Sequence, residues 1–306
     1  MRPSVHRPPD PQPKPKGPAL CLYHDDPDGC CAAAIVRRAL GEDVVLHPLE
    51  IGDPIPWDLV EASGRVVMVD YSLPLEEMRR LGTGRELLWI DHHKSALEQL
   101  AEAMVDVPGE RSTEAAACVL AWRTFFPGIP LPLSVTLVGD RDTWQMAHAE
   151  TRAFSEGLFQ MDFKPTNDGL WRALLDDDKA LVRQLIDRGQ LLYESRLKST
   201  KDIVARGGFP VSFEGHRTLA VNHPGTGDMG EDIRRAGYEI AYCYVELVRS
   251  GVLQTVVTLY SDSVDVSEIA RKFGGGGHRG AAGFQFQRRD RPFPPGSVGA
   301  GPASSE

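Results

Sequence analysis

The chain has 306 residues, of which 42% are hydrophobic and 25% charged, the composition of an ordinary folded protein long enough for two domains. Its formal net charge of −9 argues against a protein that coats long nucleic acid, because such proteins need a large basic surface. No apolar run approaches the roughly 20 residues of a membrane span. The five cysteines form no Cys-x-x-Cys pair, which predicts reduced thiols and a cytoplasmic location.

Two blocks of different pattern lie between Pro-rich ends. We interpret residues 1–18 and 289–306 as disordered tails, since they are rich in Pro, Gly and Ser and poor in apolar side chains. Apolar runs alternate with helix-like stretches over residues 19–175, which predicts a parallel sheet with helices on both faces. Residues 176–208 have the spacing of a long connecting helix, and 209–288 are β-rich. The expected fold is therefore α/β, followed by a smaller α+β domain.

The expected elements follow one another in a regular order. In the first block, buried-strand segments are expected at 19–23, 66–69, 87–90 and 135–138, with helices at 29–40, 74–81 and 112–126. In the second block, strands are expected at 210–213, 218–221, 239–248, 252–260 and 283–287, with a helix at 266–273.

Acids and histidines follow the four apolar segments of the first block. Because the carboxyl ends of parallel strands meet at one edge of a sheet, we expect these side chains to gather there. The residues concerned are His24, Asp26, Asp28, Asp70, Asp91, His92, His93, Asp140 and Asp142.

A metal site explains such a gathering. Clustered carboxylates repel one another and raise their own pKa values, whereas divalent cations compensate their charge. Histidine and carboxylate ligands without cysteine suit Mn²⁺ and, less well, Mg²⁺ or Zn²⁺. Two metals about 4 Å apart are a standard device for phosphoryl transfer. The alternative is that each aspartate caps a helix, which is common for a single acid but a poor account of the whole set.

A glycine-rich segment marks the second block. Residues 274–283 include six glycines, which let backbone N–H groups approach a phosphate closely. His278 and Arg279 add charge and hydrogen-bond donors. The alternative is a flexible turn between a helix and a strand.

Together these motifs resemble those of the DHH phosphoesterases that carry a DHH-associated C-terminal domain. The resemblance covers roughly residues 19–287 and rests on the motifs His24-x-Asp26-x-Asp28-Gly29, Asp70, Asp91-His92-His93, Asp142-Thr143, Gly275-Gly276-Gly277-His278 and Ala281-Ala282-Gly283. It implies a phosphohydrolase with two Mn²⁺ ions that acts on nucleotidic phosphodiesters or on phosphomonoesters such as 3′-phosphoadenosine. The family includes nanoRNases, cyclic-dinucleotide phosphodiesterases and the RecJ exonuclease.

The resemblance also implies a role for each residue. It implies that the metal ligands are His24, Asp26, Asp28, Asp70, His92 and Asp142. Asp140 is an alternative to Asp142 as the last of these ligands. Asp70 would bridge the two metals. His93 would contact the scissile phosphate, and Asp91 would hold a neighbouring imidazole. Substrate would be bound by Gly275, Gly276, Gly277, His278 and Arg279.

The function expected from these residues is hydrolysis of short oligonucleotides, dinucleotides or 3′-phosphoadenosine 5′-phosphate by a hydroxide that two Mn²⁺ ions activate. Mg²⁺ or Co²⁺ would be substitutes for Mn²⁺. The expected partner is a short nucleic acid or nucleotide rather than a membrane, and a homodimer is left open. Two alternatives are a phosphoanhydride hydrolase acting on pyrophosphate or polyphosphate, and a non-catalytic nucleotide sensor.

Overall fold

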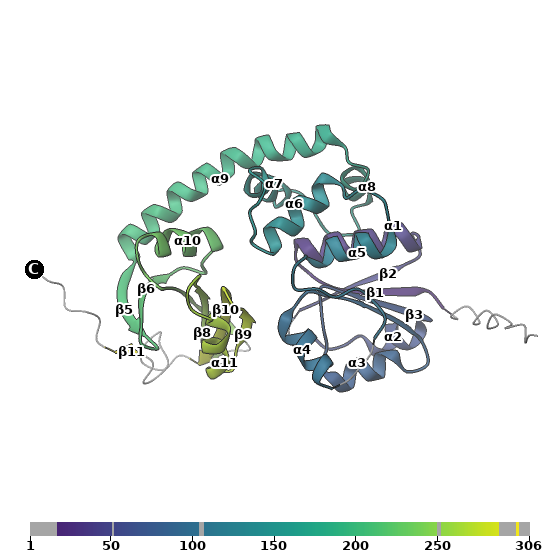
Figure 1. Ribbon diagram of the computed structural model, residues 1–306, viewed down its shortest axis with the longest axis horizontal. Coiled ribbons are helices and arrows are strands. Elements are labelled where there is room, and N and C mark those ends of the chain that lie inside the picture. Colours follow the sequence, from purple (N-terminus) through teal and green to yellow (C-terminus); the bar gives the residue numbers. More distant parts are fainter. Residues whose placement is uncertain (1–16, 51, 104–106, 250–251, 288–297, 300–306) are drawn as a thin grey trace, which may run out of the picture. The chain divides into compact units, whose positions relative to one another are not determined.

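The computed structural model divides into two compact units, Met1–Gly189 and Gln190–Glu306 (Figure 1). It describes residues 17–50, 52–103, 107–249, 252–287 and 298–299. The tails expected at 1–18 and 289–306 lie outside the described residues, apart from residues 17–18 and 298–299. No helix within the described ranges has both the length and the apolar content needed to cross a membrane.

The first unit is built on a four-stranded sheet that contains three of the four expected strands and one strand, Val45–Leu49, that was not expected. Its strands are β1 (Ala19–His24), β2 (Val45–Leu49), β3 (Arg65–Val69) and β4 (Glu86–Ile90), in the order β2-β1-β3-β4. All three pairings are parallel, so the predicted parallel sheet is confirmed. All four strands therefore end at the same edge of the sheet.

Helices cover both faces of this sheet (Figure 1). The helices α1 (Pro27–Leu40) and α5 (Ala117–Phe125) lie on one face, and α2 (Trp57–Ala62), α3 (Leu75–Gly82) and α4 (Lys94–Glu102) lie on the other. The helices α6 (Leu133–Asp142), α7 (Thr151–Leu158) and α8 (Asp168–Leu175) pack against α1, α5 or one another. Successive residues of a strand point to opposite faces. Cys21 and Tyr23 accordingly join the core under α1, α5 and α6, whereas Leu20 and Leu22 join the core under α2, α3 and α4.

Two expectations for this unit are wrong. Residues 135–138 were expected to form a strand but lie inside α6, which begins after Pro132. This helix is buried on several sides, with Ser134, Val135, Leu137 and Val138 all buried, and a short apolar run of that kind has no visible period. The helix expected at 112–126 begins only at Ala117.

The second unit is the expected smaller α+β domain. Its strands are β5 (Phe209–Phe213), β6 (His216–Asn222), β7 (Ile240–Arg249), β8 (Val252–Tyr260), β9 (Gly276–His278), β10 (Ala281–Gln287) and β11 (Val298–Gly299), in the order β11-β5-β6-β7-β8-β10-β9. The β6–β7 pair is parallel and the other pairs are antiparallel.

One helix packs on each face of the second sheet. The helix α10 (Gly227–Arg235) contributes Met229 and Ile233 to one apolar cluster, and α11 (Val266–Lys272) contributes Ile269 and Ala270 to the other. The elements α10, β9 and β11 were not predicted from the sequence. The long helix α9 (Lys179–Gly207) occupies the segment expected to connect the domains, and the division between the units falls within it.

Candidate metal centre

The polar residues at the carboxyl edge of the first sheet follow its strands directly. His24 is the last residue of β1, Asp70 follows β3, and Asp91 follows β4. The side chain of Asp70 is only 1% exposed, and its backbone has a φ of +54°, in the left-handed region. Aspartate tolerates that region better than most residues, and such local strain is typical of functional sites. The backbone at the edge thus aims a carboxylate into the interior.

The turn from β1 into α1 requires a glycine and an aspartate. Asp26 caps α1 by accepting a hydrogen bond from the backbone N–H of Gly29 over 2.9 Å. A Cβ atom at Gly29 would lie 2.0 Å from the carbonyl oxygen of His24, so no larger residue fits there. The capping interpretation is correct for one oxygen of Asp26, and its other oxygen lies 3.1 Å from His24 Nδ1.

Asp28 also caps a helix, although not its own. Its two carboxylate oxygens accept the backbone N–H groups of Ala117 over 2.7 Å and Cys118 over 2.9 Å. These are the first residues of α5, whose own N-cap, Ala116, has no side-chain acceptor. The buried acid therefore determines where α5 begins, which explains why the sequence placed that start too early.

The side chains converge on Asp70. Its Oδ1 lies 3.2 Å from His92 Nε2 and its Oδ2 lies 3.6 Å from His24 Nδ1. His92 Nε2 lies a further 3.2 Å from Asp142 Oδ2. Three groups of side chains are close enough to hold a cation: Asp70 with His92 and His93, His24 with Asp26 and Asp70, and Asp28 with His92 and Asp142. Asp70 belongs to two of these groups, and so does His92.

The electrostatics of these groups fit a divalent cation. Burial, followed by the charge of Asp28, raises the pKa of Asp70 well above its ordinary value, and the pKa of Asp142 is raised for the same two reasons. Both carboxylate oxygens of Asp70 and Oδ2 of Asp142 are buried and have no hydrogen-bond partner among the described residues. Buried carboxylates without partners are costly, and a bound cation would compensate them. The residues present therefore fit a metal.

The acidic neighbours of His24 favour a protonated ring. The carboxylates of Asp26 and then of Asp70 raise the pKa of its imidazole to about 11, against the smaller opposing effect of burial. A metal that binds this ring must displace the proton, so metal binding and proton release are coupled.

Asp91 orients His93. Its Oδ1 accepts the backbone N–H groups of His92 over 2.7 Å and His93 over 3.2 Å, and it lies 2.8 Å from His93 Nδ1. Burial lowers the pKa of His93, but the hydrogen bond and charge of Asp91 outweigh it, so the net shift is upward. A carboxylate at Nδ1 favours the tautomer with a proton on that nitrogen.

The side chains of Asp140 and Asp142 have different surroundings in the structure. Asp140 accepts hydrogen bonds from the backbone N–H groups of Ala147 over 2.8 Å and His148 over 3.2 Å, and from the Thr151 hydroxyl. It thereby holds the turn that leads into α7. The structure brings Asp142 to the groups that could hold a metal, and Asp140 is not among them.

The sequence analysis missed two neighbours of His24. Glu50 follows β2, and its Oε2 lies 3.6 Å from His24 Nε2. The hydroxyl of Tyr71 donates to the carbonyl oxygen of Glu50 over 2.9 Å. The signal was weak because His47 and Pro48 interrupt the apolar run of β2.

The glycine-rich segment of the second unit is a hairpin. Gly276–His278 form β9, which pairs with β10. A Cβ atom at Gly275 would lie 2.0 Å from the carbonyl oxygen of Gly283, and Gly277 has a φ of +135°. These two glycines therefore have structural reasons. His278 is exposed, and the side chain of Arg279 is 68% exposed, with Nη1 4.0 Å from Asp265 Oδ2.

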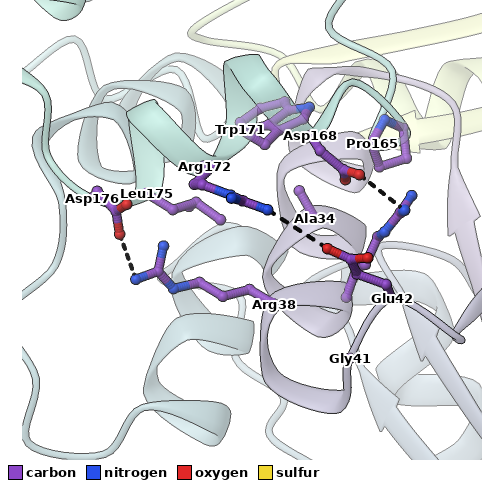
Figure 2. A pocket seen from close by; sticks show the side chains of 11 residues that line it. Ala34, Arg38, Gly41, Glu42, Pro165, Asp168, Trp171, Arg172, Leu175 and Asp176 are labelled. Atoms are coloured by element: carbon purple, nitrogen blue, oxygen red, sulfur yellow. Dashed lines mark hydrogen bonds and ion pairs between the residues drawn. The ribbon is translucent and has the colours of Figure 1, made fainter.

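A cavity of about 400 Å³ between α1 and α8 contains none of the predicted site residues (Figure 2). Three ion pairs line it: Arg37 with Asp168 at 3.0 Å, Arg38 with Asp176 at 2.6 Å, and Arg172 with Glu42 at 3.6 Å. Each arginine there has an acidic partner of the same unit, so the pairs fasten α8 to α1 and to the turn after it.

Comparison with known proteins places the fold. No family model matches the chain. An uncharacterized protein of Acanthamoeba polyphaga mimivirus is 26% identical over 231 residues, which are 72% of this chain and 53% of that protein. The chain thus spans about half the length of that curated relative.

Two solved structures match most of the chain. A DHH domain from a member of a family of ribosomal proteins matches with a TM-score of 0.59 and 14% identity, covering 88% of this chain and 82% of that one. A manganese-bound exonuclease RecJ matches with a TM-score of 0.48 and 17% identity, covering 88% of this chain and 86% of that one. The first of these likenesses confirms the expected architecture: this chain has the fold of a DHH domain.

Proposed function

We propose that this protein is a metal-dependent phosphoesterase whose reaction takes place at the carboxyl edge of the first sheet. The observation that carries the proposal is the position of Asp70. Its two oxygens face different groups of possible ligands, Oδ1 toward His92 and Oδ2 toward His24, and neither oxygen has a hydrogen-bond partner among the described residues. A buried carboxylate shared between two such groups suits two adjacent cations.

The ligand set would be His24, Asp26, Asp28, Asp70, His92 and Asp142. It is a mixture of imidazoles and carboxylates, which favours Mn²⁺, with Mg²⁺ or Co²⁺ as substitutes. Divalent cations bound there would lower the pKa of water, orient it toward phosphorus and neutralise charge on the phosphate. Asp28 would serve two purposes, because its hydrogen bonds to the start of α5 also fix its orientation.

His93 would act on the phosphate. Its ring is held by Asp91 through Nδ1, and its side chain is 34% exposed, so Nε2 is the nitrogen that would meet a substrate. A hydrogen bond from a positioned imidazole to a phosphate oxygen stabilises the charge that develops during attack. Asp91 would be a positioning residue that fixes the ring and its tautomer.

Substrate binding would involve the second unit as well. The hairpin that carries Gly275, Gly276, Gly277, His278 and Arg279 is exposed, so its backbone and charged side chains are open to a second phosphate or to the nucleotide end. The net charge of −9 offers little basic surface for a long polymer. We therefore propose a short substrate: an oligonucleotide of a few residues, a dinucleotide or 3′-phosphoadenosine 5′-phosphate.

The test is a substrate panel on purified protein, first stripped with chelator and then given single metals. The panel contains an aryl phosphodiester, a linear dinucleotide, 3′-phosphoadenosine 5′-phosphate and pyrophosphate. We expect no hydrolysis after stripping and the greatest recovery with Mn²⁺ on a nucleotidic substrate. Recovery on pyrophosphate alone would replace the proposal with a phosphoanhydride hydrolase. Nucleotide binding without turnover under any metal would replace it with a sensor.

A further inference from the structure

A lysine reaches a residue that stands between two of the proposed metal ligands, an exposed aromatic ring lies near the same loop, and no motif pointed to either of them. Lys164 belongs to the loop between α7 and α8, and its Nζ lies 2.5 Å from Oδ2 of Asp25. Asp25 stands between His24 and Asp26, and its other oxygen accepts a weak hydrogen bond from the Cys30 thiol over 3.6 Å. The loop thus places an ammonium group next to the segment that contains the first two proposed ligands, His24 and Asp26.

The backbone that carries Lys164 is fixed. The indole Nε1 of Trp171 donates to the carbonyl oxygens of Phe163 over 3.0 Å and Lys164 over 3.2 Å. The backbone N–H of Asn167 also donates to the Lys164 carbonyl oxygen, over 2.9 Å. Trp171 is itself only 2% exposed, so this anchor belongs to the core. A cation on such a loop is preorganised, which lowers the entropic cost of binding an anion.

The charge of Lys164 is partly available to solvent. Its side chain is 48% exposed, whereas that of Asp25 is 25% exposed. An ammonium has three donors, and one carboxylate oxygen occupies one of them. A lysine also remains charged when neighbouring histidines bind metal as neutral rings. This cation therefore suits an anionic group bound at the metals.

An aromatic pair adjoins the ammonium. Lys164 Nζ lies 5.9 Å from the centre of the Phe163 ring, and Phe163 in turn meets Phe159 edge to face at 6.2 Å between ring centres. Phe163 packs on the core of the first unit, but Phe159, just after α7, is 41% exposed. An exposed ring one neighbour away from a cation offers a stacking surface for a base whose phosphate the cation holds.

We propose that Lys164 and Phe159 form a nucleotide-binding subsite beside the metal centre, with the lysine on the phosphate and the Phe159 ring on the base. The inference deepens the proposed function, on which it rests, by placing recognition of a nucleotide within the first unit. It distinguishes nucleotides from other phosphate compounds, because only a ligand with a base can use both residues.

The test measures binding rather than turnover. Isothermal titration of the Mn²⁺-loaded protein would use two probes, adenosine 5′-monophosphate and inorganic phosphate. Lys164→Gln should weaken both probes about tenfold, because it removes a charge-assisted contact to phosphate. Phe159→Ala should weaken the nucleotide about tenfold and leave inorganic phosphate unchanged, because it removes only stacking. Lys164→Arg and Phe159→Tyr should each stay within about threefold of the wild type, since they keep the charge and the ring.

Two controls separate a contact from a structural role. Lys179→Gln makes the same charge change at an exposed lysine of the same unit and should leave both affinities unchanged. The Mn²⁺ affinity of Lys164→Gln and Phe159→Ala should equal that of the wild type. Equal losses for both probes in Phe159→Ala, or wild-type affinity in Lys164→Gln, would overturn the inference, as would wild-type protein that does not bind the nucleotide.

The two proposals fail separately. A protein that shows this binding pattern but hydrolyses no phosphoester would refute the proposed function and leave the subsite intact. An active phosphoesterase whose Lys164→Gln and Phe159→Ala variants bind both probes normally would refute the subsite alone.

Discussion

The two regions that the sequence singles out are built in opposite ways. The acidic edge of the first unit is buried, with Asp70 and Asp91 at most 1% exposed, and its backbone is fixed by hydrogen bonds. The glycine hairpin of the second unit is exposed over all of β9. The first region is therefore rigid, as the proposed metal chemistry would require, and the second is accessible, as the proposed substrate binding would require.

The acids of the first region and the glycines of the second are present for different reasons. Burial and the charges of Asp28 and then Asp70 raise the pKa of Asp142, and Asp142 Oδ2 and both oxygens of Asp70 have no hydrogen-bond partner among the described residues, so the fold gains no stability from placing these acids together. At Gly275 and Gly277 the surrounding backbone leaves no room for a side chain, so only glycine fits there. Function explains the acids better than stability does, whereas stability alone explains those two glycines.

The largest effect should follow from Asp70→Asn. Loss of the shared carboxylate should lower turnover about 10³-fold or more, because both cations would lose a ligand. Asparagine keeps the size of the side chain and tolerates the left-handed backbone, so the fold should persist in circular dichroism. His47→Ala, in β2, should change turnover by less than about twofold. Similar losses in the two variants would mean that the active site lies elsewhere.

Asp140 and Asp142 are two residues apart, and a pair of variants separates the structural role of one from the proposed metal-binding role of the other. Asp142→Asn should weaken Mn²⁺ binding about 10- to 100-fold, as measured by titration. Asp140→Asn should leave Mn²⁺ binding unchanged and lower the free energy of unfolding by about 1–3 kcal/mol, because it weakens the hydrogen bonds to Ala147, His148 and Thr151. Reversed results would make Asp140 the ligand.

The fold was predictable where local signals agree. The helix expected at 29–40 is α1, with Gly41 at its end at a φ of +105°, and the strand expected at 252–260 is β8. The expectation was wrong at 135–138, because a segment buried on several sides loses the period that distinguishes a helix from a strand. The start of α5 was missed because its cap, Asp28, comes from a distant part of the chain.

The site was predictable only in part for the same reason. His24, Asp26, Asp28, Asp70, His92 and His93 come together after the ends of β1, β3 and β4, as a strand-end pattern suggests, whereas Asp142 joins them from the end of the helix α6 rather than from the expected strand. Glu50 and Lys164 reach the same edge through tertiary structure, one from a strand interrupted by Pro48 and the other from a loop anchored by Trp171. No spacing between residues in the sequence indicates that these two side chains lie near the edge of the sheet.

A smaller effect is expected in the second unit. Arg279→Ala should lower kcat/KM on a linear dinucleotide about 10- to 100-fold, since it removes a charge-assisted contact to a phosphate. The same variant should leave the rate on a small aryl phosphodiester within about twofold, because that substrate is too short to need the hairpin. Equal losses on both substrates would show that Arg279 serves the fold or the chemistry instead.

The smallest effect tests why the hairpin contains glycine. Gly277→Ala places a Cβ atom 2.7 Å from the carbonyl oxygen of Ala281 at a φ of +135°, so it should lower the free energy of unfolding by about 1–3 kcal/mol in urea. Gly276→Ala is the matched control: no atom lies within 4 Å of its Cβ and its φ is not positive, so stability should change by less than about 0.5 kcal/mol. Turnover on the aryl phosphodiester should be unchanged in both. If Gly276→Ala instead weakened dinucleotide binding while leaving stability intact, close approach of a ligand to the backbone would be the reason for that glycine.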